Sequence, residues 1–92
     1  MSKTFNTAVE ASEIVRDLHS QHLRLPHNSD IYRLISNIST MVTNLSKMEV
    51  AARNVRNVRN HSAKLAVENC KQEIEQAIKH VQHLLLMAKL MA

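Results

Sequence analysis

The chain contains no glycine among its 92 residues, and its single proline is Pro26. Left-handed turns, strand bulges and phosphate-binding loops normally depend on glycine, whereas helices do not need it. The sequence therefore predicts an all-α protein. The same absence removes the glycine-rich motifs by which a short chain indicates an activity, so function must be inferred from periodicity, charge and the placement of a few polar residues.

Apolar residues recur at alternating spacings of three and four along three segments, which is typical of amphipathic helices. Thr7 and Glu10 form a capping-box pattern before the first segment, and Pro26 ends it. Asn28 or Ser29 can cap the second helix, with Asp30 in its first turn. We expect a single domain over residues 1–92, with helices at about 7–24, 30–58 and 62–91.

Each predicted helix carries one apolar stripe that we expect to face the core. The first stripe consists of Ala8, Ala11, Val15, Leu18, His22 and Leu25. The second consists of Ile31, Leu34, Ile38, Met41, Leu45, Met48, Ala52 and Val55. The third consists of Ala63, Val67, Cys70, Ile74, Ala77, Val81, Leu84, Ala88 and Met91.

Two places in this pattern could end a helix. Ser46 and Glu49 form a second capping-box pattern, but the stripe keeps its phase across them, so we expect one continuous helix there. After Val55 the alternating spacing of three and four no longer leads to apolar residues, and the next apolar series is one residue out of step. This change predicts a glycine-free connection at residues 60–62. The two long helices should then form an antiparallel hairpin, with the first helix covering about half of it.

The chain is small, and Phe5 and Tyr32 are its only aromatic residues, so its core must be built from smaller apolar side chains. We therefore expect this three-helix unit to assemble into a larger homodimeric bundle. The lone Cys70 excludes an intrachain disulfide, and the longest apolar run is too short to span a bilayer. These features predict a cytoplasmic protein with no signal peptide and no membrane association.

The net charge of +4 is concentrated in the second half of the chain. Residues 1–50 carry five basic and five acidic side chains, whereas residues 51–92 carry seven and three. No acidic residue occurs between Val50 and Val67. The candidate phosphate-binding residues of this segment are Arg53, Arg56, Arg59 and Lys64. This pattern suits nucleic-acid phosphates, but also a solvated helix end in which Glu49 pairs with Arg53.

The histidines are candidate metal ligands, because His19 with His22, and His80 with His83, each lie on one helical face. His22 falls on the apolar stripe, however, and no carboxylate is positioned to orient His80 or His83. We therefore expect no metal and no cofactor.

The spacing of His61 and Lys64 is similar to that of histidine phosphotransfer domains, which are also helical bundles. That family has glycine directly after the lysine, where this chain has Leu65. We assign no family on two residues, and no Ser, Cys or His lies in a recognisable catalytic arrangement.

Two features predict a protein interface. From Leu34 to Ser46 the chain has no charge, so Ser36, Ser39 and Thr43 allow a partner helix to approach closely. Leu86 and Leu90 lie off the third stripe and form a second apolar face near the end of the chain. Both features could instead be covered by the first helix within one chain.

The resulting hypothesis is a small non-enzymatic interaction protein, acting as an adaptor, regulator or assembly subunit through an apolar helix face. We expect a homodimer, with a protein partner also possible. The alternative is a basic helical protein that binds nucleic acid through residues 53–64.

Overall fold

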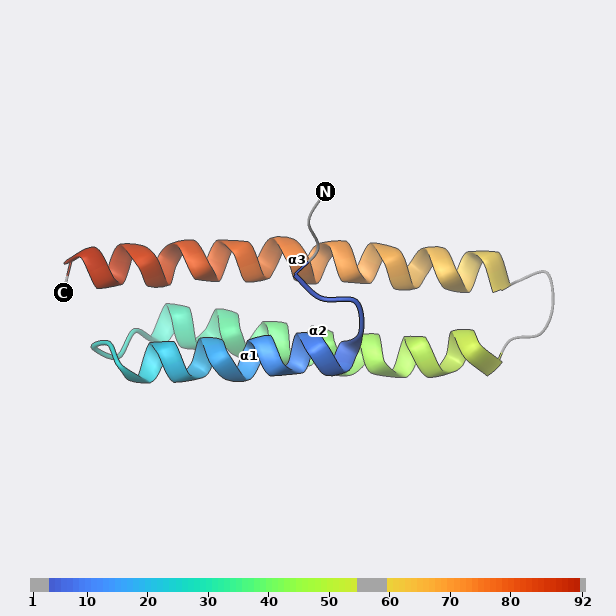
Figure 1. The fold of residues 1–92 in the computed structure, drawn as a ribbon, viewed down its shortest axis with the longest axis horizontal. Coiled ribbons are helices and arrows are strands. Elements are labelled where there is room, and N and C mark those ends of the chain that lie inside the picture. Colours follow the sequence, from blue (N-terminus) through green and yellow to red (C-terminus); the bar gives the residue numbers. More distant parts are fainter. Residues whose placement is uncertain (1–3, 55–59, 92) are drawn as a thin grey trace.

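The computed structural model describes residues 4–54 and 60–91, which form three α-helices and no strand. These are α1 (Ala8–Leu23), α2 (Ser29–Asn54) and α3 (Asn60–Met91). The two long helices, α2 and α3, run antiparallel in an elongated bundle measuring 53 × 23 × 18 Å (Figure 1). The prediction of an all-α fold is therefore confirmed for the described residues.

The helix α1 packs mainly against α2 and only lightly against α3, and it covers only part of the hairpin (Figure 1). The hairpin extends beyond the start of α1, so its far end has a two-helix cross-section. None of the three helices, over the residues described, combines the length and apolar content that a bilayer span requires.

The predicted caps of the first two helices are present. The Thr7 hydroxyl accepts the Glu10 N–H at 3.3 Å and donates to the Glu10 carboxylate at 3.3 Å. At the start of α2, the Asn28 side-chain oxygen accepts the N–H groups of Asp30 at 2.9 Å and Ile31 at 3.1 Å. Each side chain satisfies backbone donors that the first turn of a helix leaves unpaired.

The turn between α1 and α2 closes without a left-handed residue, and no residue in the described ranges has a positive φ. Arg24 caps α1 in a right-handed conformation, with φ −86° and ψ −1°. The buried His22 then accepts the Asn28 N–H on its Nε2 atom at 3.1 Å. A side chain thus provides a hydrogen bond across this glycine-free turn, and His22 has the packing role that its stripe position indicates.

Helix boundaries differ from the predicted ones at the hairpin connection. Residues 60–62, predicted as a connection, belong to the first turn of α3. The phase shift lies near the change from α2, which ends at Asn54, to α3, which begins at Asn60. The predicted residues 55–58 of the second helix lie outside the described residues, whereas α2 is continuous through Ser46, as expected.

The core only partly follows the predicted stripes. On α2 the buried residues include Ile35 and Val42, whereas the predicted Leu34 and Met41 are only partly buried. The reason is that α2 contacts both α1 and α3, so its buried face is wider than one heptad seam and is centred between the two neighbours.

The buried residues of α3 also differ from its predicted stripe. Ile78 and Leu85 are buried although they lie off the predicted stripe, and Met91 on that stripe is 82% exposed. The core also contains Phe5, which precedes α1 and is 3% exposed. The segment before α1 crosses toward α3 (Figure 1), and this crossing takes the Phe5 side chain into the core.

Candidate interaction site

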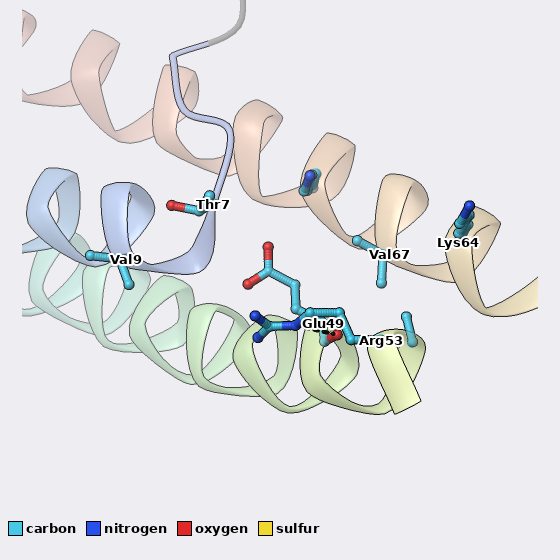
Figure 2. Close-up of a pocket in the computed structure, with 8 residues that line it drawn as sticks. Thr7, Val9, Glu49, Arg53, Lys64 and Val67 are labelled. Carbon is cyan, nitrogen blue, oxygen red and sulfur yellow. Dashed lines mark hydrogen bonds between the residues drawn. The ribbon is translucent and has the colours of Figure 1, made fainter. Parts of the chain in front are cut away.

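A groove of about 580 Å³ lies beyond the start of α1. It lies between α2 and α3 (Figure 2), and α1 does not extend along this part of the hairpin (Figure 1). Its lining residues are Thr7, Val9, Glu49, Ala52, Arg53, Lys64, Val67 and Lys71. Periodicity did not reveal this groove, because it exists only where the three helices differ in length.

Glu49 lies at the end of the groove nearest to α1. Figure 2 shows its carboxylate extending from α2 toward Thr7, and Glu49 Oε1 accepts the Ala8 N–H at 3.3 Å. The carboxylate therefore caps a helix 41 residues away in sequence. The sequence had suggested that Glu49 pairs with Arg53; instead, Arg53 Nε donates to the Glu49 backbone carbonyl at 3.4 Å.

The structure describes only some of the basic residues that the sequence suggested as phosphate contacts. Arg53 and Lys64 are both exposed and line the same groove from α2 and α3 respectively. Lys71, which the sequence did not single out, lines it as well, and its Nζ lies 3.7 Å from Glu68 Oε1. Arg56 and Arg59 lie outside the described residues.

At the opposite end of the molecule, the last turns of α3 present large apolar side chains to solvent. Leu86 is 54% exposed and Leu90 is 74% exposed, and Met87 and Met91 are also exposed. These four residues, which we call the α3 tip, lie at the end of the bundle where α1 and α2 are joined (Figure 1). The structure thus leaves the predicted second apolar face of α3 uncovered.

The uncharged face of α2 is partly occupied by α1. Ser36 is half-buried, and Ser39 and Thr43 border a shallow groove of about 330 Å³ together with residues of α1. The Thr43 hydroxyl donates to the Ser39 backbone carbonyl at 3.1 Å. Because such local bonds satisfy the hydroxyl within its own helix, this face offers a partner fewer free donors than the sequence suggests.

The histidines separate into two groups. His19, His22 and His27 gather with Tyr32 at the α1–α2 turn, where the ring centroids of His22 and His27 lie 5.5 Å apart. His80 and His83 are exposed on α3. Within residues 4–54 and 60–91, no three His, Cys, Asp or Glu side chains are grouped so that they could hold a metal ion.

Cys70 is a partly buried free thiol on α3. Burial raises its pKa above the ordinary value, and the nearby carboxylates of Glu73 and Glu49 raise it further. A raised pKa keeps the thiol protonated at neutral pH, which is the opposite of what an activated nucleophile requires.

No protein-family model, curated protein or solved structure matches this chain.

Proposed function

We propose that the protein is a non-enzymatic helical interaction module that forms a homodimer through the α3 tip. The observation that carries this proposal is the exposure of four large apolar side chains on consecutive turns of one helix: Leu86, Met87, Leu90 and Met91. Removing a leucine side chain from water contributes roughly 1.5–3 kcal/mol, so several such side chains favour association.

A second copy of the chain is the occupant that best fits this tip. In a two-fold interface each residue meets the same surface on its partner, so the patch must be complementary to itself. Lys89 is the only charged residue from Leu84 to Met91, and no acidic residue follows Glu75. An apolar patch of this kind can meet its own copy without opposing clusters of like charge, whereas a charged partner would find little to pair with.

The character of Cys70 supports the non-enzymatic part of the proposal. The single thiol has a raised pKa, and burial is the first cause. As an adaptor, regulator or assembly subunit, such a protein would act through its surfaces rather than through a reactive group.

The double variant Leu86→Lys/Leu90→Lys tests the proposal. Both side chains are exposed, so the variant should keep its helical circular-dichroism spectrum, while light scattering should show the dimer dissociating to monomers. The matched control is Val50→Lys/Leu65→Lys, which adds the same charge at residues of comparable exposure elsewhere on the hairpin, and it should remain dimeric.

Two results would contradict self-association through the α3 tip. One is an unmodified chain that is monomeric at high micromolar concentration. The other is a control variant that dissociates as readily as the Leu86→Lys/Leu90→Lys variant. A dimeric chain from which neither variant dissociates would also rule out the α3 tip, and the uncharged face around Ser39 and Thr43 would then be the surface to test.

A further inference from the structure

The groove beyond the start of α1 continues a site that the protein already uses for helix packing. Over part of the hairpin, α1 lies along α2 and also contacts α3. The groove begins at Thr7 and Val9, where α1 starts, and extends along α2 and α3 to Arg53 and Lys64 (Figure 2). A helix in the groove would therefore pack on the same two helices as α1 does.

The groove combines an apolar base with a basic rim. Val67 is 8% exposed and Ala52 is half-buried, and Figure 2 shows Val67 pointing from α3 toward α2. Small side chains at the base allow close approach of another helix. Among the described lining residues, three cations, Arg53, Lys64 and Lys71, oppose one carboxylate, that of Glu49, which gives these residues a net charge of +2.

The carboxylate and one of the cations already have partners within the chain. Glu49 caps the Ala8 N–H, and Lys71 lies 3.7 Å from Glu68. Arg53 uses its Nε atom on the Glu49 carbonyl, and both Arg53 and Lys64 are exposed at the rim. A ligand that carries carboxylates beside an apolar surface would match both parts of this groove.

We propose that the groove binds an acidic amphipathic helix of a partner protein. The apolar face of that helix would pack on Ala52 and Val67, and its flanking carboxylates would pair with Arg53 and Lys64. This mode of binding reproduces the packing of α1 on the hairpin, and it requires no aromatic side chain in the groove.

A second copy of this chain does not fit the groove as well. The apolar surface that we propose for self-association is the α3 tip, and the one charged residue between Leu84 and Met91, Lys89, is basic. A nucleic acid would match Arg53 and Lys64 but not the apolar base, and the described residues that line the groove include no aromatic side chain to stack on bases. Charge and apolar surface together therefore favour an acidic helix.

The probe for the test is a synthetic acetylated peptide with leucines at heptad a and d positions and glutamates beside them. A matched peptide has lysines in place of the glutamates. Fluorescence anisotropy with the full chain should give an affinity for the glutamate peptide about tenfold or more above that for the lysine peptide, since like charges at the rim oppose binding. Amide chemical shifts should move at Ala52 and Val67.

The variant Arg53→Glu/Lys64→Glu should bind the glutamate peptide at least about tenfold more weakly, because the charges of both exposed rim cations are reversed. The control Lys47→Glu/Lys89→Glu has the same change in net charge at two exposed residues outside the groove, and it should bind as the unmodified chain does. All four substituted side chains are exposed, so the helical fold should persist.

The proposal would be overturned if the chain bound the two peptides with equal affinity or bound neither. It would also be overturned if the test and control variants lost peptide affinity equally, or if the peptide shifted amide signals only at the α3 tip. Displacement of the peptide by duplex DNA, with DNA binding lost in the Arg53→Glu/Lys64→Glu variant, would instead assign the groove to phosphates. Concentration-dependent shifts at Ala52 without peptide would assign it to a second copy.

The groove and the α3 tip can be tested independently. Leu86 and Leu90 do not line the groove, so the Leu86→Lys/Leu90→Lys variant should bind the glutamate peptide with unchanged affinity. If the chain proves monomeric but binds the peptide, only self-association is wrong. If it dimerises but binds the two peptides with equal affinity, only the groove proposal is wrong.

Discussion

Glu75 holds Thr4 across the bundle through two hydrogen bonds. One carboxylate oxygen accepts the Thr4 backbone N–H and the other accepts its hydroxyl, both at 2.8 Å. These residues are 71 positions apart, so the contact fixes the segment before α1 onto the middle of α3. The neighbouring Phe5 is directed into the core.

Replacing Glu75 with Gln should loosen this segment, because an amide has one accepting oxygen where the carboxylate has two. We expect a loss of about 1 kcal/mol in the free energy of unfolding, since both bonds are exposed to solvent. Hydrogen exchange at the Thr4 amide should become faster. The control is Glu73→Gln, at an exposed position on the same helix; an equal effect there would show that the Thr4 contact is unimportant.

Replacing Phe5 with Ala should destabilise the fold by roughly 3–5 kcal/mol, because it removes a buried ring and leaves a cavity between the helices. Urea denaturation followed by circular dichroism measures this loss. Tyr32, the other aromatic residue, is 52% exposed, so Tyr32→Ala should cost much less. A larger loss for Tyr32→Ala than for Phe5→Ala would mean that the segment before α1 does not contribute to the core.

Replacing His22 with Ala should cost roughly 2–3 kcal/mol, because the substitution removes a buried ring and leaves the Asn28 N–H without its acceptor. His83→Ala, at an exposed position on α3, should be nearly neutral. Urea denaturation again gives both values. If the two variants are equally stable, His22 does not support the turn.

Cys70 should react with iodoacetamide more slowly in the folded chain than in urea, because burial raises its pKa and leaves less thiolate at a given pH. Glu73→Gln should accelerate the reaction by removing one of the carboxylates that raise this pKa. Mass spectrometry follows the alkylation. Equal rates in the folded and unfolded chains would contradict the assigned environment.

The same shift has a consequence for stability at high pH. The folded chain keeps the Cys70 thiol protonated to a higher pH than the unfolded chain does, because its pKa is raised. Its contribution to stability is therefore complete below the unfolded pKa and is lost as the pH rises through the folded pKa. Cys70→Ser should remove this component of alkaline destabilisation in urea titrations at increasing pH.

Local sequence determined the secondary structure and most of its limits. Glycine is absent, Thr7 and Asn28 are good caps, and Pro26 follows a helix, so each end of α1 and the start of α2 can be explained by nearby residues. The alternation of apolar residues identified the core of α1 well, because α1 buries one narrow stripe.

Only the tertiary structure decided the rest. Ile35 and Ile78 are buried because α2 and α3 have wider buried faces than one heptad stripe, and the width of a face depends on how many neighbours a helix has. The partnership of Glu49 with Ala8 joins residues on separate helices, so no local pattern could indicate it. The groove follows from the same cause: hydrophobic periodicity gives the length and apolar face of each helix, but a cavity arises only where helices of unequal length are packed together.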